Sequence, residues 1–297
     1  MTSVLLLRIG FDWLFAPHLS SNPSVSASDE TLKQKLASMV IHVAGAELRV
    51  ILDKVGHDID ADTTPSTHDI HVVAQDCSNI LLATITFLSM ELSRLEDLEG
   101  KQSDRHGPGL WTWESIEGIH RVLAETVEAC FDFLVDIQRA TSKHQVQTMM
   151  RQEDGVVQHS LRVVLAWCVE DESSQHRLVS LASFLVDLIR LDGSRLTGHT
   201  DDHVLDMTWF VEQVDLICEQ DPVLSQALIE AKMLPVLQEK LQHRIPMNHT
   251  EQATDHVKPW IQLCDALFKE SDAFLENTVQ DKDVIALIEL VKRLHLE

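Results

Sequence analysis

The chain has 297 residues, 44% of them hydrophobic, so it is long enough to bury a substantial core and is not disordered throughout. Its 47 acidic residues outnumber its 24 basic residues, which gives a net charge of -23. That charge repels phosphate backbones and anionic headgroups, so we do not expect nucleic acid as the main partner.

The amino-terminal stretch is apolar, but it does not have the pattern of a secretory signal. Arg8 and Asp12 interrupt the apolar run from Met1 to Ala16, and no basic region precedes it. Acidic or basic residues also interrupt every later apolar stretch before it reaches the roughly 20 residues of a membrane span. The five cysteines lie apart in apolar helical patterns, as expected for small buried side chains in a reducing compartment. We therefore expect a cytoplasmic protein without a transmembrane segment.

Apolar residues at three- and four-residue steps predict three long helices in the first half of the chain, over residues 32–55, 70–98 and 113–139. The first has so broad an apolar stripe that we expect it to be buried around most of its girth, with Gly56 as its carboxyl-terminal stop. Loops are expected over residues 57–69 and 99–112. We expect Trp111 and Trp113 to hold the second loop against the helices rather than to form an exposed recognition patch.

Shorter helices are predicted in the second half of the chain, over residues 156–169, 175–191, 205–219, 223–240, 256–269 and 283–294. Residues 171–174 (DESS) offer candidate N-caps, Asp221 is a candidate N-cap followed by Pro222 in a first helical turn, and Pro235 predicts a break. Loops are expected over residues 192–203 and 243–255. The helices form pairs that recur about every 40 residues, which is typical of HEAT and armadillo repeats.

These helices are apolar over more than half of their surface, so an isolated pair could not cover its own apolar side chains. Stacking on neighbouring pairs would cover them. We therefore predict an all-α protein, an armadillo/HEAT-like α-solenoid of stacked helix pairs that forms a single domain over residues 1–297. A globular all-α bundle is the alternative.

The sequence contains fragments of metal-binding patterns but no complete one. Asp58, Asp60 and Asp62 begin like a calcium loop, yet its glycine and glutamate positions hold Thr63 and Asp69. Two histidine pairs have suitable spacing but lack a third ligand nearby, namely His68 with His71 and His199 with His203. A solvated loop and surface histidines account for these residues.

Motifs for nucleophilic catalysis, phosphate binding and dinucleotide binding are also missing from the sequence. We therefore predict that the protein is not an enzyme, and we nominate no catalytic, cofactor-binding or metal-binding residue. No cofactor or small-molecule ligand is expected. The alternative enzyme would be a metal-dependent hydrolase that uses His57, Asp58, His68 and His71.

Three stretches together resemble the neurochondrin family of armadillo-like helical proteins. They are residues 7–14 (LRIGFDWL), residues 161–172 (LRVVLAWCVEDE) and residues 207–237, which begin MTWFV. The sequence departs from the family pattern at Pro17 and Cys168, where leucines are expected, and matches only loosely over residues 47–49. Because the resemblance begins in the middle of a repeat, we expect this chain to lack the family's amino-terminal helices.

The resemblance implies a cytoplasmic, non-enzymatic adaptor, associated in animals with neurite outgrowth, neuronal signalling and restraint of a calmodulin-dependent kinase. It transfers no catalytic residue. We therefore predict a scaffold that binds other proteins along a solenoid groove. The alternative is another armadillo or HEAT adaptor, such as a transport factor or an exchange-factor chaperone.

Overall fold

The computed structural model describes residues 27–60, 68–99, 111, 113–140, 155–191, 207–244, 254–278, 287 and 291. Within these ranges the backbone is helical apart from a few capping and turn residues, and it contains no strand. The all-α prediction is therefore confirmed, while the solenoid arrangement stays a prediction. The predicted helix over residues 283–294 lies outside the described residues except for Leu287 and Val291, which are helical and buried.

The chain divides into two compact units. Unit 1 comprises Met1–Thr141 and Thr148–Ala166, and unit 2 comprises Ser142–Gln147 and Trp167–Glu297. The expectation of a single domain over residues 1–297 stays a prediction, and the two units are described separately.

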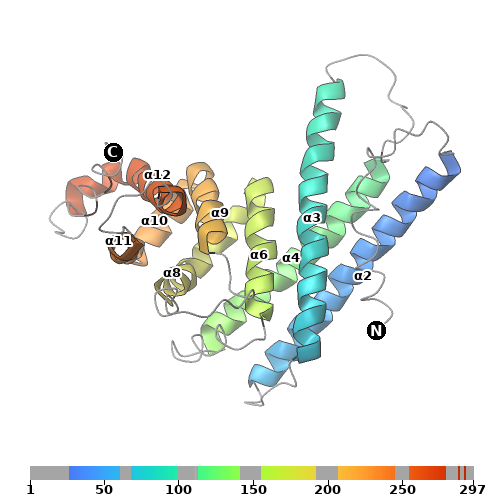
Figure 1. Ribbon diagram of the computed structural model, residues 1–297, viewed down its shortest axis with the longest axis horizontal. Coiled ribbons are helices and arrows are strands. Elements are labelled where there is room, and N and C mark those ends of the chain that lie inside the picture. The colour runs from blue at the N-terminus through green and yellow to red at the C-terminus, as the bar shows by residue number, and fades with distance from the viewer. Residues whose placement is uncertain are drawn as a thin grey trace. The chain divides into compact units, whose positions relative to one another are not determined.

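Unit 1 is built from three long helices and the first part of a fourth (Figure 1). They are α2 (Ala27–Asp60), α3 (His68–Glu99), α4 (Trp113–Ala140) and α6 (Val156–Glu170). Helix α2 packs against both α3 and α4. Fully buried aliphatic side chains fill the interior, among them Ile41, Leu48, Leu81, Ile119, Leu123 and Leu134. Their burial is the main favourable contribution to the stability of this unit.

Helix α2 is longer and less buried than predicted. It continues through Gly56 to Asp60, because Gly56 does not adopt the left-handed backbone that ends a helix and the buried Val55 continues the apolar face. Its other face is open to solvent, since Leu32 and Val50 are exposed. The expectation of burial around most of the girth was therefore wrong.

The four predicted loops lie only partly, or not at all, within the described residues. Helix α3 begins at His68, so both described ends of the 57–69 segment are helical. In the 99–112 segment, Glu99 ends α3 and Trp111 lies outside any helix. The 192–203 segment lies entirely outside the described residues, and helices extend to Arg244 and from Thr254 at the two ends of the 243–255 segment.

Unit 2 contains the end of α6 and a series of shorter elements. They are α7 (Glu172–Gln175), η1 (His176–Leu181), α8 (Ala182–Leu191), α9 (Met207–Gln220), α10 (Pro222–Glu230), α11 (Met233–Arg244) and α12 (Thr254–Thr278). Helices α9, α10 and α11 pack against α12. Phe210, Leu178 and Trp260 are among the fully buried side chains of this unit.

The structure places N-caps at Asp171, within the predicted segment 171–174, and at the predicted Asp221, and the two have nearly the same geometry. Asp171 has φ -121° and ψ 92°, and Asp221 has φ -119° and ψ 99°. Each carboxylate accepts a hydrogen bond from the backbone N–H two residues later, from Ser173 at 3.2 Å and from Val223 at 2.9 Å. Such caps satisfy a backbone donor that the first helical turn leaves unpaired.

The likeness of the two caps extends to the residues around them. The buried Gln175 donates from Nε2 to the carbonyl of Cys168 at 2.8 Å, and the buried Ser225 donates from Oγ to the carbonyl of Cys218 at 3.2 Å. The second set follows the first at an offset of 50 residues, from 171 to 221. The same helix, cap and helix arrangement therefore recurs at a longer spacing than the 40 residues expected.

The break near Pro235 lies earlier than predicted. Helix α10 ends at Glu230, and α11 begins at Met233 after a turn in which Lys232 has φ 72°. Pro235 therefore lies in the first turn of α11, where its missing N–H breaks no helical hydrogen bond.

We predict that Asp171→Ala destabilises the protein more than Asp221→Ala does. Asp221→Ala removes one cap and should lower the free energy of unfolding by about 1 kcal/mol. Asp171 also accepts from Trp167 Nε1 at 3.0 Å, so its loss leaves an indole donor with one partner fewer and should cost about 2 kcal/mol. Urea unfolding followed by circular dichroism measures both values. The exposed Glu172→Ala is the control, and a cost for Asp171→Ala no larger than this control contradicts the assignment.

Candidate functional site

A groove of about 610 Å³ in unit 1 lies between α2 and α4. Both helices contribute side chains to its walls. Its lining consists of Leu52, Asp53, Gly56 and His57 from α2, and Ala129, Asp132, Phe133, Asp136, Ile137 and Arg139 from α4.

The groove combines an apolar floor with an acidic rim. Leu52, Phe133 and Ile137 are buried, whereas Asp53 and Asp132 are exposed. The exposed Asp136 forms an ion pair with Arg139, with 3.7 Å between Oδ1 and Nη1, and an exposed pair of this kind contributes little stability. The groove thus offers apolar contact together with negative charge.

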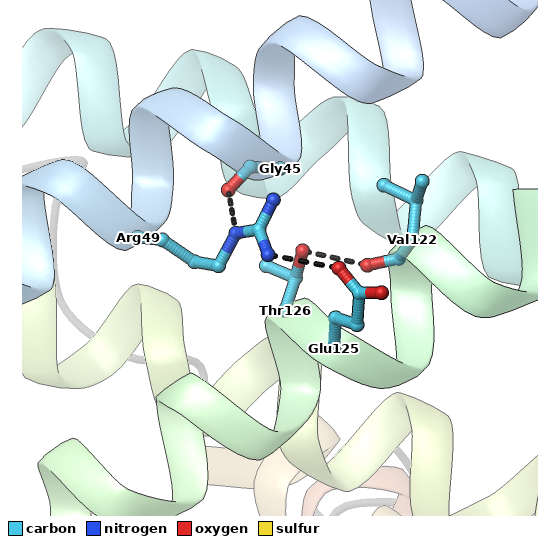
Figure 2. Close-up of polar contacts among 5 residues, drawn as sticks. All are labelled: Gly45, Arg49, Val122, Glu125 and Thr126. Carbon is cyan, nitrogen blue, oxygen red and sulfur yellow. Dashed lines mark hydrogen bonds and ion pairs between the residues drawn. The ribbon is translucent and has the colours of Figure 1, made fainter.

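The two helices approach each other closely on the amino-terminal side of the groove. A Cβ atom added to Gly45 would lie 2.7 Å from Thr126 Oγ1 and 3.1 Å from Val122 Cγ1, so only glycine fits between these helices (Figure 2). Thr126 Oγ1 donates to the Val122 carbonyl at 2.7 Å and is thereby held in place.

Arg49 adds a polar link at the same place. Its Nε donates to the Gly45 carbonyl at 3.3 Å, and its Nη1 lies 3.0 Å from Glu125 Oε2 on α4 (Figure 2). The first groove residues, Leu52 and Ala129, follow within one helical turn of this contact on each helix. The Arg49 and Glu125 link therefore lies at the amino-terminal edge of the groove.

We predict opposite effects of alanine at two glycines of α2. Gly45→Ala should destabilise the protein by about 1–2 kcal/mol, because the steric clash outweighs the gain in helix propensity. A Cβ atom at Gly56 would meet nothing within 4 Å, so Gly56→Ala should stabilise the protein by up to about 1 kcal/mol. Chemical unfolding of the two variants measures both signs, and stabilisation by Gly45→Ala contradicts the close contact.

Unit 2 contains a second feature, a buried carboxyl group on α9. Asp215 is 8% exposed, and its Oδ1 has no hydrogen-bond partner among the residues that the structure describes. Its pKa is raised to about 6, chiefly by burial and also by the charges of Glu219 and Asp265, while the charge of Lys269 lowers it. Glu219 and Lys269 lie 3.9 Å apart and line a shallow groove of about 440 Å³ with residues of α12.

We predict that Asp215→Asn stabilises the protein in a pH-dependent way. Because the folded-state pKa is raised, Asp215 favours folding most below the pKa of an unfolded aspartate, near 3.9, and this contribution is lost as the pH rises through about 6. The variant should therefore be more stable than wild type by about 1–3 kcal/mol at pH 8, and this gain should shrink towards pH 5. Urea unfolding across this pH range, with the exposed Glu212→Gln as control, measures the effect. A constant difference between pH 5 and pH 8 contradicts the assignment.

The cysteines lie where their apolar surroundings predicted. All five are buried and free of disulfide bonds. Burial raises the pKa of Cys77, Cys130 and Cys218 to about 12, and it also raises the pKa of Cys168 and Cys264. These thiols stay protonated near neutral pH and so are poor nucleophiles or metal ligands.

The structure tests only part of the remaining sequence-based expectations. Of the four residues of the hydrolase alternative, His57 is exposed and lines the groove, while the side chains of Asp58, His68 and His71 lie outside the described ones. The described residues hold no group of three or more histidine, cysteine, aspartate or glutamate side chains that could bind a metal ion.

The two tryptophans beside the 99–112 segment differ. Trp111 packs on Phe87 of α3, with ring centroids 5.1 Å apart and planes at 59°, as expected for a residue that anchors the loop. Trp113 is 65% exposed. The expectation that both rings are tucked away therefore holds for Trp111 alone.

One described stretch in α3, Val72–Ser93, has the length and apolar composition of a membrane-spanning helix. The core helix of a soluble protein satisfies the same criterion, and Ala74, Leu81 and Leu88 of this stretch are buried against other parts of the chain. It is therefore weak evidence for a membrane span.

Comparison of the chain with protein-family models, with curated proteins and with solved structures gives no significant match. Sequence reasoning did not find the α2–α4 groove or Asp215. Asp132 and Asp136 were visible as an acidic pair four residues apart, but the helix that faces them was not.

Proposed function

We propose that this chain is a non-enzymatic helical scaffold that binds segments of other proteins, with the groove between α2 and α4 as one binding site. The observation that carries the proposal is the combination of a buried apolar floor with an exposed acidic rim. Because half of its lining residues are apolar and half are charged or polar, the groove can select a partner by charge as well as by apolar contact.

The lining of the groove specifies the chemistry of its partner. An apolar side chain would contact Leu52 and Phe133, and a lysine or arginine would face Asp53 and Asp132. The net charge of -23 attracts basic segments and repels nucleic acid, which supports a protein partner.

The recurring cap geometry at Asp171 and Asp221 supports a helical-repeat architecture. Within the proposal, the resemblance to neurochondrin suggests a cytoplasmic adaptor, acting in animals in neuronal signalling and neurite outgrowth. Another armadillo or HEAT adaptor, such as a transport factor or an exchange-factor chaperone, has the same architecture with a different partner and remains the second candidate.

The proposal predicts that groove charge controls partner binding. Immobilised full-length protein should capture partners from cytosolic extract, and Asp132→Lys with Asp136→Lys should reduce that capture at least about tenfold, because lysines on the rim repel basic segments. Quantitative mass spectrometry measures the capture, and cross-linking identifies the contacted residues.

A matched charge change away from the groove provides the control. Glu172→Lys with Glu212→Lys alters two exposed carboxylates of unit 2 by the same total charge. If both double variants capture the same partners as wild type, or if no partner is captured at low salt, the proposal is wrong.

A further inference from the structure

Helix α2 carries an apolar seam on its solvent side. Four large side chains are exposed, Leu32 by 57%, Met39 by 54%, Val43 by 38% and Val50 by 62%. With Leu36 and the exposed Ala46 between them, these residues follow one another in alternating steps of four and three. This is the spacing of a coiled-coil seam, in which side chains of one helix insert between those of a partner helix.

A second apolar seam of the same helix, the inner seam, is already packed against other helices of unit 1. Ala37, Ile41, Ala44 and Leu48 are buried in unit 1, where α2 packs against α3 and α4. With about 3.6 residues per turn, Ile41 and Val43 point to nearly opposite sides of the helix. The outer seam is therefore a separate apolar surface. Exposed apolar surface that is contiguous, rather than scattered, marks interaction sites.

The charges beside the outer seam decide which partner fits. One edge carries Lys35, His42 and Arg49 at heptad spacing, the first two exposed and the third half-buried beside Glu125. The opposite edge carries the exposed Glu47 and Lys54. A basic edge is exceptional in a chain with a net charge of -23.

A second copy of this chain does not complement that edge. In an antiparallel pair of α2 helices, the basic edges face each other, so Lys35 meets Arg49 of the other copy. In a parallel pair, Arg49 instead meets Lys54, and only His42 meets a carboxylate, that of Glu47. Like charges across a helix pair oppose association, whereas carboxylates on the facing helix would attract. At physiological ionic strength these local charges outweigh the distant ones, because charges are screened over about 8 Å.

We propose that the outer seam of α2, residues 32, 36, 39, 43, 46 and 50, docks an amphipathic helix of a partner protein whose own apolar seam is flanked by glutamate or aspartate. This inference rests on the proposed function, because it assumes that the chain binds other proteins. It adds a second surface, which lies on the amino-terminal side of the groove along α2 and has the opposite charge preference.

Three synthetic helices of four heptads test the proposal by fluorescence anisotropy with the full-length protein at about 0.15 M salt. The first has leucine at both seam positions and glutamate on both edges, the second has lysine on the edges, and the third has serine in place of the seam leucines. The glutamate-edged helix should bind at least about tenfold more tightly than either of the others. No saturable binding of this helix, or equal binding of the lysine-edged helix, would overturn the proposal.

Variants of the protein locate the contact. Met39→Glu with Val43→Glu should weaken binding of the glutamate-edged helix at least about tenfold, and Lys35→Glu should reduce its preference over the lysine-edged helix. Met90→Glu is the control, because Met90 is 69% exposed on α3 and lies outside the seam. Equal binding to all three variants would show that the helix docks elsewhere.

The remaining outcomes separate this inference from the proposed function. The groove variant Asp132→Lys with Asp136→Lys should bind the glutamate-edged helix as wild type does. If extract partners depend on the groove while the helix does not bind, the inference fails and the function stands. A wild-type dimer in sedimentation velocity that Met39→Glu with Val43→Glu dissociates would identify a second copy as the occupant and overturn the inference.

Discussion

The need to cover apolar helix surface is the constraint on which this structure depends. Helix α6 satisfies it, since the successive residues Val163, Val164 and Leu165 are all fully buried. Helix α2 satisfies it on one side only, where its inner seam packs in unit 1 while its outer seam remains exposed. Because water disfavours contiguous apolar surface, an uncovered seam on a long helix is a site where another helix gains free energy by docking.

Local sequence patterns predicted the helices well, because helical periodicity records which positions are buried. The caps in segment 171–174 and at Asp221 could also be predicted from the sequence, because a capping side chain binds the backbone only two residues away. Helix ends were harder to predict. Gly56 and Pro235 are both helix breakers by propensity, yet one continues a helix and the other sits in a first turn. In each case backbone geometry and the burial of neighbouring residues decided the outcome.

The candidate sites could not be predicted from the sequence, because they depend on which helices pack against each other. Gly45 and Gly56 look alike in the sequence, but only Gly45 has α4 against it. The groove could not be predicted either, because it is lined by residues of two helices whose contact the sequence does not reveal. The apolar stripe of α2 was visible, but without its neighbours the stripe could not be divided into a buried and an exposed seam.

Charge distinguishes the two surfaces on which the proposed scaffold depends. The groove is rimmed by carboxylates, and the outer seam has a basic edge, so the two surfaces favour different partners. This arrangement lets one long helix contribute to two contacts. The inner seam holds α2 against α3 and α4, and Arg49 also forms an ion pair with Glu125 of α4.

Methionine footprinting tests the central claim most directly, because α2 and α3 each expose one methionine. Met39 lies in the outer seam and Met90 lies outside it, and they are 54% and 69% exposed. Oxidation of the protein inside cells and after purification, read by mass spectrometry, compares the two sites. If the chain is a scaffold whose outer seam is occupied by partners, Met39 is protected in cells relative to the purified protein while Met90 is oxidised equally in both. Equal oxidation of Met39 in cells and after purification would contradict the account.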